Sequence, residues 1–247
     1  MMNRIKILDT YVDNLTMAET VTVVDQFIKE KKPLHLMGVN ADKINMLRKD
    51  PQLKDIVNGC DVINADGASV VWASKVLGKP LKERVAGIDL MYHLMELAEK
   101  RGYQVYFLGA KQEVVTETVD IVKKMHPALQ IVGYRNGYFK KDEWSEIAEM
   151  LRESRAQIVF VGITSPLKEY LVEYLQNQDL NCVFMGVGGS FDVVSGNIPR
   201  APKWVQNIGM EWLFRVLQEP GRLWKRYFFG NIEFITSVYR EKFRKSK

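Results

Sequence analysis

The chain has 247 residues, 47% of them hydrophobic, which is enough for one large α/β domain or two small ones. The two cysteines and three histidines are scattered, with no CxxC or HxxxH pair, which argues against a zinc site and indicates reduced thiols in a cytosolic protein. The formal net charge of +5 is uneven, because residues 200–247 hold eleven Lys and Arg against four Asp and Glu, whereas residues 1–199 hold 24 against 26. A mildly acidic body therefore carries a basic tail.

The first part of the chain alternates short apolar runs with helical patterns. Thr16 and Glu19 form a capping box, and Pro51 is typical of a first helical turn. The predicted elements are a strand over 5–12, a helix from Thr16, a strand over 34–39, a helix over 41–47, a short helix from Pro51, and a strand at 62–63 with a helix after Gly67.

From residue 103 the alternation becomes regular. Continuous apolar runs indicate strands that are buried on both faces of a parallel sheet. Strand–helix alternation predicts a doubly wound, Rossmann-like α/β core with helices on both faces. The runs cover 105–108, 131–132, 158–161 and 182–185 and end at Gly109, Gly133, Gly162 and Gly186, with helices over about 112–125, 144–151 and 166–175.

Asp66 stands on the turn between the strand at 62–63 and the next helix, within Asn64-Ala65-Asp66-Gly67. A carboxylate at this place can cap the helix N-terminus, which is the commoner use of Asp there. It can also project into the crevice at the carboxyl end of the sheet, where α/β proteins bind ligands. The turn by itself is compatible with both roles.

Several strand ends should meet at one edge of the sheet. In a parallel sheet Asn40, Asp66, Gly109, Gly162 and Gly186 converge on one crevice, where glycines admit a ligand to the backbone and helix N-termini offer N–H donors to an anion. Each glycine taken singly is more often an ordinary turn residue, and neither a Walker loop nor GxGxxG is present. The coincidence of several glycines is what favours a pocket for a phosphate-bearing nucleotide.

Cations lie near the predicted crevice. Lys111 and Lys168 each sit near the start of a helix that follows a strand, where they either meet phosphate oxygens or remain solvated. Arg84 pairs with a phosphate or with the glutamate before it. Asp89 is predicted to cap the helix that starts near it, and Glu169 needs no role beyond a favourable charge at a helix start.

No aspartate pair is placed to hold a metal ion. Asp61 and Asp66 are too far apart to clamp one ion as neighbours, and no DxD pair stands at a strand end. We therefore expect neither a metal nor another cofactor. Lys, Arg and helix ends would carry the negative charge of a phosphate ligand instead.

The basic tail interleaves aromatic residues with cations, and Pro220-Gly221 breaks it into two helical pieces. Basic helices with a bulky apolar face lie in membrane interfaces and are drawn there by anionic lipid. A C-terminal helix docked on the core is the second interpretation, and nucleic-acid binding is a distant third because the body is acidic. The aromatic residues are Trp204, Trp212, Phe214, Trp224, Tyr227, Phe228, Phe229 and Phe234.

No other segment of the sequence points to a membrane. The first residues contain no apolar stretch typical of a secretory signal, and no run of 18 apolar residues occurs. We therefore expect a cytoplasmic protein that is bound peripherally to the inner face of the membrane. A truncated tail would leave apolar surface that favours self-association into a homo-oligomer.

Taken together, these segments resemble the WecG/TagA/CpsF glycosyltransferase family over most of the chain, from about residue 40 to 226. The segments that carry the resemblance are Asn64-Ala65-Asp66-Gly67 with Val71-Trp72-Ala73-Ser74, Glu83-Arg84-Val85-Ala86-Gly87 with Asp89-Leu90-Met91, Phe107-Leu108-Gly109-Ala110-Lys111, Gly137-Tyr138-Phe139, Phe160-Val161-Gly162 with Pro166 and Glu169, Gly186-Val187-Gly188-Gly189-Ser190-Phe191-Asp192, Arg200-Ala201-Pro202-Lys203-Trp204, and Glu211-Trp212-Leu213-Phe214-Arg215 with Glu219-Pro220 and Arg222.

The resemblance implies an inverting, metal-free transfer of a sugar from a UDP-sugar to a sugar on undecaprenyl diphosphate, in cell-wall or surface polysaccharide synthesis. The best-known donors carry an N-acetylmannosamine derivative. The family's proposed base falls on Asp66, and the C-terminal arginines thought to reach the acceptor diphosphate and close the site fall on Arg215, Arg222 and the Lys225-Arg226 pair. The remaining residues expected to bind substrate are Asn40, Asn64, Arg84, Gly109, Lys111, Gly162, Lys168, Gly188, Gly189 and Asp192.

Two positions depart from the family pattern. Gly38 stands where the family often has threonine, and Lys168 stands where it has glutamine. Both lie where the donor sugar or its diphosphate would sit. The expected organisation is an α/β catalytic core over residues 1–199 and a helical, membrane-associating appendage over 200–247.

Two rival functions use the same features. A nucleotide-dependent oxidoreductase would need a GxGxxG loop and a downstream acid for the ribose, and neither is found in place. A membrane-recruited sensor would bind the UDP-sugar without catalysis and would tolerate the loss of Asp66. Release of UDP with and without a lipid-diphosphate sugar separates the sensor from the transferase.

Overall fold

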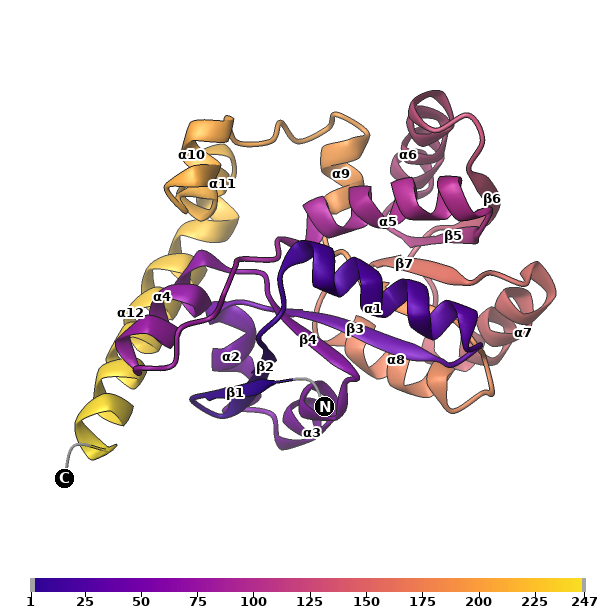
Figure 1. Ribbon diagram of the computed structural model, residues 1–247. Helices are drawn as coiled ribbons and strands as arrows, with labels where there is room; N and C mark the ends of the chain where they lie inside the picture. Colours follow the sequence, from indigo (N-terminus) through magenta and orange to yellow (C-terminus); the bar gives the residue numbers. More distant parts are fainter. Residues whose placement is uncertain (1–2, 246–247) are drawn as a thin grey trace.

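The computed structural model describes residues 3–245, except the side chains of Asn207, Arg222, Arg226 and Lys245. Within this range the centre of the molecule is a six-stranded parallel sheet in the order β4-β3-β8-β7-β5-β6 (Figure 1). The predicted parallel sheet is therefore confirmed. Its strands are β3 (Leu34–Val39), β4 (Val62–Ala65), β5 (Gln104–Gly109), β6 (Gln130–Arg135), β7 (Ile158–Gly162) and β8 (Val183–Gly186).

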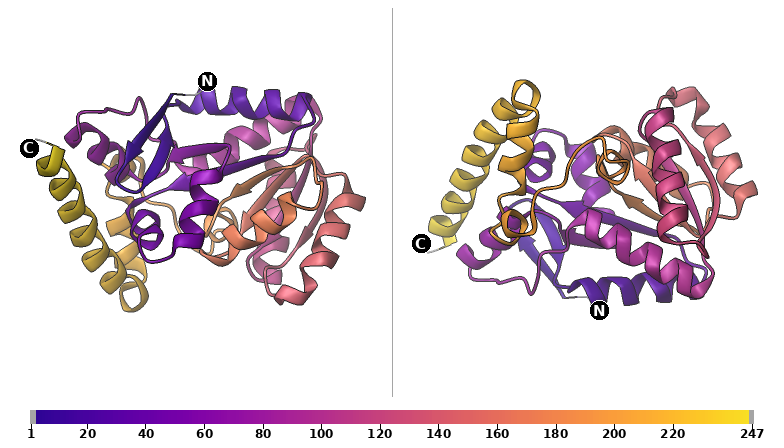
Figure 2. Two further views of the ribbon diagram at one scale, coloured as in Figure 1. Left: turned by 90° about the horizontal axis from the view of Figure 1, so that it is seen from below. Right: turned by 90° about the horizontal axis from the view of Figure 1, so that it is seen from above.

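Helices cover both faces of the sheet, as predicted (Figures 1 and 2). Alternate residues of each strand point to opposite faces, so Phe107 packs on the first face and Leu108 on the second. This burial on both sides explains the continuous apolar runs. The first face carries α1 (Met17–Lys29), α5 (Gly87–Arg101), α6 (Gln112–Met125) and α9 (Ser190–Val194); the second carries α2 (Ala41–Leu47), α3 (Pro51–Gly59), α7 (Trp144–Ser154) and α8 (Leu167–Gln176).

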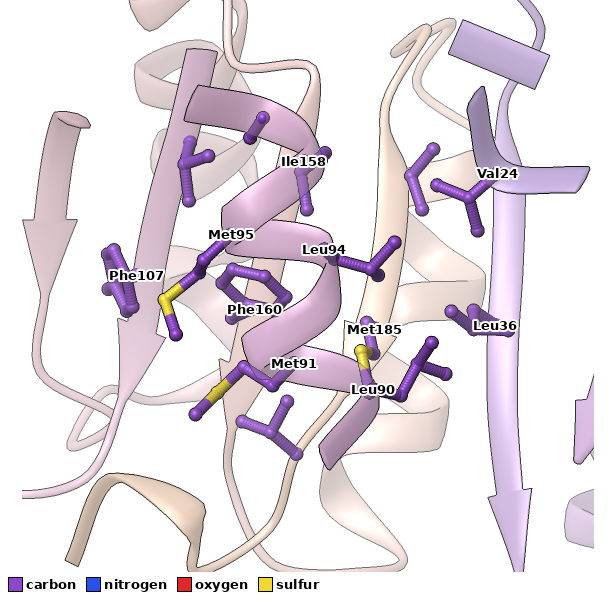
Figure 3. Close-up of a cluster of buried hydrophobic side chains, with 14 of the residues drawn as sticks. Val24, Leu36, Leu90, Met91, Leu94, Met95, Phe107, Ile158, Phe160 and Met185 are labelled. Atoms are coloured by element: carbon purple, nitrogen blue, oxygen red, sulfur yellow. The ribbon is translucent and has the colours of Figure 1, made fainter. Parts of the chain in front are cut away.

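The core of the first face centres on α5, which packs across the middle strands (Figure 3). Full burial of an apolar side chain of this size contributes about 1.5–3 kcal/mol relative to leaving it exposed. The packing of α5 therefore holds the middle strands, whose carboxyl ends lead into the loops that follow, in place. The side chains that meet there are Leu90, Met91, Leu94 and Met95 from the helix and Leu36, Phe107, Phe160 and Met185 from the strands.

The predicted single strand over residues 5–12 is wrong. Two antiparallel strands, β1 (Arg4–Ile7) and β2 (Thr10–Asp13), form a hairpin there. Leu8 at the turn has a φ of 53°, a left-handed conformation that leucine seldom adopts and that apolar periodicity does not reveal. The hairpin packs against edge strand β4, where Asp13 accepts a hydrogen bond from the Ile63 N–H at 2.8 Å.

Other element boundaries were mostly predicted. The capping box is present, since the Glu19 N–H donates to Thr16 Oγ1 at 3.2 Å and the Thr16 N–H donates to the Glu19 carboxylate at 2.8 Å. Strand β6 is longer than predicted and continues through Gly133 to Arg135. A Cβ at Gly133 would lie 2.4 Å from the Tyr106 ring, so this glycine accommodates packing and does not end the strand. A short 3-10 turn, η1 (Lys141–Glu143), precedes α7.

Between residues 200 and 245 the chain forms the helices α10 (Lys203–Asn207), α11 (Glu211–Gln218) and α12 (Pro220–Lys245). The predicted break at Pro220-Gly221 is confirmed, because α11 ends at Gln218 and α12 begins at Pro220. Helix α12 runs along one side of the molecule (Figure 2). It packs on α2 and α4 (Ala68–Val76), with Phe234 and Val238 fully buried. Within residues 3–245, no helix combines the length and the apolar character that crossing a bilayer requires.

Candidate functional site

The carboxyl ends of the central strands open into one cleft of about 1860 Å³. The structure brings Asn40, Asp66, Gly162 and Gly186 to this cleft from four different strand ends. Gly109 lies behind the wall, where it pairs with Gly162 across β5 and β7. The tail completes the wall with Trp212, Phe214, Arg215, Tyr227 and Phe228.

The cleft lies at the point where the winding of the sheet reverses. Strand β3 leads into α2 on the second face, whereas its neighbour β8 leads into α9 on the first face. The two helices diverge, and a crevice opens between the ends of β3 and β8. This switch point is where doubly wound α/β proteins bind their ligands.

Asp66 follows β4 and lines the cleft. It does not cap the next helix, because the N-cap of α4 is Gly67 and no side chain bonds there. Its Oδ1 instead accepts a hydrogen bond from the Gly87 N–H at 2.7 Å, which satisfies one of the free donors at the start of α5. Among the described side chains Oδ2 has no hydrogen-bond partner. A Cβ at Gly38 would stand 3.2 Å from the Asp66 Cβ, so the glycine leaves room beside the carboxylate.

Two asparagines flank this carboxylate. Asn40 caps α2, since its Oδ1 accepts a hydrogen bond from the Lys43 N–H at 2.9 Å. Asn64 is 2% exposed, and its Oδ1 accepts a hydrogen bond from the Thr20 hydroxyl at 3.2 Å. The Asn64 Nδ2 has no partner among the described residues, although Asn64 borders the cleft. A ligand acceptor atom would satisfy it.

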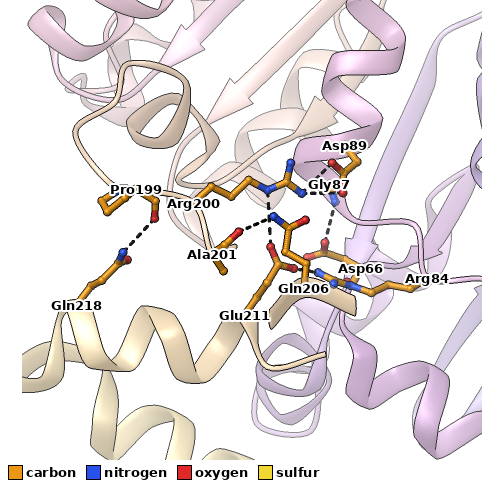
Figure 4. Close-up of polar contacts among 10 residues, drawn as sticks. All are labelled: Asp66, Arg84, Gly87, Asp89, Pro199, Arg200, Ala201, Gln206, Glu211 and Gln218. Atoms are coloured by element: carbon orange, nitrogen blue, oxygen red, sulfur yellow. Dashed lines mark hydrogen bonds and ion pairs between the residues drawn. The ribbon is translucent and has the colours of Figure 1, made fainter. Parts of the chain in front are cut away.

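A charged network joins the Asp66 turn to the tail (Figure 4). Arg84 Nε donates to the Asp66 carbonyl oxygen at 2.7 Å, and its guanidinium pairs with Glu211 of α11. Arg200 lies 3.8 Å from Glu211 and 2.8 Å from Asp89. The two partners predicted for Arg84, a phosphate or the glutamate before it, did not include Glu211. The predicted N-cap role of Asp89 is also wrong, because α5 begins two residues earlier, at Gly87, and Asp89 lies in its first turn.

Two lysines share one carboxylate beside the cleft. Lys43 Nζ pairs with Glu169 and donates to Ser165 Oγ at 2.6 Å, while Lys168 Nζ lies 2.9 Å from Ser165 Oγ and 3.1 Å from Glu169. Burial lowers the pKa of Lys43 to about 8. Although burial opposes the shift, the two lysines lower the pKa of Glu169 to about 2. The prediction that Glu169 only complements the helix dipole is wrong, because its side chain is fully buried in this cluster.

Glycine is needed at and after the strand ends for different structural reasons. A Cβ at Gly109, whose φ is +136°, would lie 2.5 Å from the Gly162 backbone, and a Cβ at Gly162 would lie 2.6 Å from the Phe191 ring. These two serve close packing. Gly188 has a φ of +53°, and a Cβ at Gly189 would lie 3.4 Å from the Arg215 guanidinium. The second pair therefore lies where the core and the tail approach each other.

The other predicted binding residues lie around the cleft. Lys111 is the N-cap residue of α6, and Asp192 lies in the first turn of α9; both line the cleft, as does Arg215. The side chains of Arg222 and Arg226 lie outside the described residues, so only their positions on α12 are known. Among the residues that the structure describes, no group of three His, Cys, Asp or Glu side chains is arranged to hold a metal ion.

Comparison with known proteins identifies the family of the chain. Residues 5–247 match the profile of the Glycosyl transferase WecG/TagA/CpsF family. The chain belongs to this glycosyltransferase family. The glycosyltransferase is also similar to the N-acetylglucosaminyldiphosphoundecaprenol N-acetyl-beta-D-mannosaminyltransferase of Bacillus spizizenii (strain ATCC 23059 / NRRL B-14472 / W23). The two sequences are 33% identical over 214 residues, and this alignment covers 87% of this chain and 82% of the relative.

Three polar residues of the candidate site were not predicted from the sequence. Lys43 follows a strand in the same way as Lys111 and Lys168, and that signal was available but unused. Glu211 is the sole acid between residues 200 and 218, and a lone acid in a basic segment suggests a specific partner. Arg200 opens one of the segments that carry the family resemblance, but nothing in the sequence indicated its partners, because it is one of many cations in the tail.

Proposed function

We propose that the protein transfers a sugar, with inversion, from a UDP-sugar to a sugar carried on polyprenyl diphosphate at the cytoplasmic face of the membrane. The observation that carries this proposal is the Asp66 carboxylate on the wall of the cleft, anchored through Oδ1 at 2.7 Å from the Gly87 nitrogen. Membership of the glycosyltransferase family supports the reaction class. The acceptor class is supported by the name of the Bacillus relative.

Asp66 acts as the general base. The acceptor hydroxyl attacks the anomeric carbon from the face opposite UDP, and the new C–O bond forms as the C–O bond to UDP breaks. The hydroxyl proton passes to Asp66, and the electron pair of the broken bond leaves with the UDP β-phosphate oxygen. Base catalysis of this kind contributes about 10²–10⁴-fold. The Gly87 N–H orients the carboxylate through one oxygen and leaves the other for the hydroxyl.

The charge on the leaving UDP is met by the cations of the cleft, without a metal. Lys111, Lys168 and Arg215 all line the cleft. Fixed positive groups that are already in place stabilise developing negative charge most effectively. Asp192, in the first turn of α9, holds the uridine or its ribose.

The transferred sugar is N-acetylmannosamine or a related hexose, and the acceptor is N-acetylglucosamine on undecaprenyl diphosphate. Both assignments are supported by the name of the relative that is 33% identical. The product would serve the synthesis of a cell-wall polymer or a surface polysaccharide.

The tail binds the membrane and brings the active site to the acceptor. Helix α12 presents Trp224, Phe228, Phe229 and Phe243 to solvent, and Lys225 lies among them. A basic helix with exposed aromatic residues suits an anionic membrane surface. Because residues of this tail also line the cleft, contact with the membrane would exclude water from the donor.

The experiment that tests the function measures UDP release in EDTA, with a panel of UDP-hexoses and UDP-N-acetylhexosamines and a short prenyl-diphosphate-linked N-acetylglucosamine. We expect release with one donor only, and only when the acceptor is present. UDP binding without release from any donor would contradict the transferase and favour a UDP-sugar sensor. Release that is lost in EDTA would contradict the metal-free mechanism.

A further inference from the structure

Two lysines and one glutamate form a buried cluster at the floor of the cleft. Lys43 comes from α2, while Lys168 and Glu169 open α8. Their side chains are 6%, 12% and 0% exposed, respectively. Two ammonium groups therefore share a single carboxylate, and the three residues together carry one positive charge in excess.

The cluster lies at the switch point of the sheet. Lys43 follows β3, and the aliphatic part of Lys168 lies across Gly186 at the end of β8, where a Cβ would stand 2.4 Å from Lys168 Cε. Both lysines and Ser165 line the cleft, whereas Glu169 does not. The two lysines therefore border the ligand space, whereas their counter-charge does not.

The neighbouring groups that the structure describes do not fully offset the excess charge. His35 is fully buried, and burial lowers its pKa to about 4, so it is neutral at physiological pH. Asp42 also attracts Lys43, but less strongly than Glu169 does. A buried ammonium group without a full counter-charge is costly, and burial lowers the pKa of Lys43 accordingly. An oxyanion entering from the cleft would offset that cost.

We propose that Lys43 and Lys168 form an anion subsite that binds an oxyanion of the nucleotide sugar, and that Glu169 is the fixed counter-charge that holds both ammonium groups in position. The identity of the ligand rests on the proposed function. The oxyanion is either the donor diphosphate or a carboxylate on the transferred sugar, and these two sources are distinguished by experiment.

The test compares the wild-type protein with Lys168→Gln and Glu169→Gln by isothermal titration calorimetry with UDP, UDP-glucose, UDP-glucuronate and inorganic pyrophosphate. Lys124→Gln removes the same charge from the exposed surface of α6 and serves as the control. Melting temperatures of all four proteins separate lost binding from lost folding.

If the subsite binds the diphosphate, Lys168→Gln weakens UDP and both UDP-sugars by about 10-fold or more, as expected for a lost charge-assisted hydrogen bond. If it binds a sugar carboxylate, the wild-type protein prefers UDP-glucuronate to UDP-glucose and Lys168→Gln abolishes that preference. In either case Glu169→Gln lowers the melting temperature but binds the anion at least as tightly, because the glutamine oxygen still accepts hydrogen bonds from the two ammonium groups while the competing negative charge is removed.

The opposite pattern would overturn the subsite. If Lys168→Gln binds every probe within twofold of the wild-type protein, or if Glu169→Gln weakens binding as much as it lowers stability, the cluster is only a structural ion pair. Failure of the wild-type protein to bind UDP would refute the proposed donor separately. Pyrophosphate then decides the subsite: binding that Lys168→Gln weakens supports it, and no binding overturns it.

Discussion

Arg84 and Glu211 lie 127 residues apart in the chain, yet their side chains form an ion pair that joins the loop before α5 to helix α11. The same guanidinium donates to the Asp66 carbonyl oxygen at 2.7 Å. Arg84 thus links the tail to the turn that carries Asp66, the candidate base. Both members are partly buried, with 26% and 20% of their side chains exposed, so solvent screens this pair less than a surface pair.

The Arg84–Glu211 pair should therefore position Asp66. We expect Glu211→Gln to lower kcat by about 10-fold with little change in UDP affinity, because the loss of a hydrogen bond to a charged group costs about 1.5–3 kcal/mol. Steady-state kinetics and UDP titration measure the two effects. The exposed residue change Glu149→Gln on α7 is the control. Additive effects of Glu211→Gln and Arg84→Lys in a double-mutant cycle would refute the coupling.

Asp66→Asn should separate binding from turnover. Asparagine keeps an oxygen for the Gly87 N–H but cannot accept the hydroxyl proton, so we expect near-normal UDP affinity and a loss of turnover of at least about 10²-fold. The comparison is Asp55→Asn on α3, an exposed position with the same loss of charge. Near-normal turnover in Asp66→Asn would leave this carboxylate as only the cap of α5.

Gly186→Ala should displace Lys168 through packing alone. The new Cβ would lie 2.4 Å from Lys168 Cε, and overpacking of this kind costs about 1–3 kcal/mol. We expect a lower melting temperature and weaker UDP binding. At Gly59 a Cβ meets nothing within 4 Å, so Gly59→Ala should leave both unchanged. Equal melting temperatures for the two variants would contradict the packing of Lys168 on this glycine.

The exposed aromatic residues of α12 should bind membranes and contribute little to folding. Phe228 and Phe229 are 54% and 59% exposed, whereas Phe234 is fully buried. We expect the double change Phe228→Ser and Phe229→Ser to reduce sedimentation with vesicles containing anionic lipid at an unchanged melting temperature. Phe234→Ala should instead lower stability by about 3–5 kcal/mol. Wild-type binding by the double variant would refute this surface.

His35 should make stability depend on acid pH. Burial lowers its pKa from 6.5 to about 4, despite the opposing attraction of Glu169, so the unfolded chain binds a proton more readily than the folded one. Its contribution is present above pH 6.5 and is lost as the pH falls through 4, to a total of about 3 kcal/mol. Denaturant titrations from pH 7 to 4 should show a shallower decline for His35→Gln than for the wild-type protein or exposed His93→Gln.

Local signals predicted most of the fold. The strand at residues 34–39 and the helix over 112–125 match β3 and α6, because apolar periodicity, caps and burial agree in those segments. The hairpin at the start of the chain was missed because its turn depends on a left-handed Leu8. Such a conformation is set by packing, and the local sequence does not signal it.

The site was predicted less completely because its key contacts join distant segments. The position of Asp66 at a strand end could be predicted from the pattern that precedes it, but its bond to Gly87 could not. Glu169 looked like an ordinary acid in a first helical turn until α2 brought Lys43 against it. A sequence shows which residues are charged, but only the fold shows which charges pair when they lie more than a hundred residues apart.

The hairpin at the start of the chain also protects the sheet from aggregation. Strand β4 is an edge strand, and an edge with free backbone groups invites pairing with another molecule. Here the Ile63 N–H donates to the Asp13 carboxylate, and the Ala65 carbonyl accepts a hydrogen bond from the Val85 N–H at 2.9 Å. A side chain of the hairpin and the loop before α5 thus occupy backbone groups of β4 that a neighbouring strand would otherwise pair with.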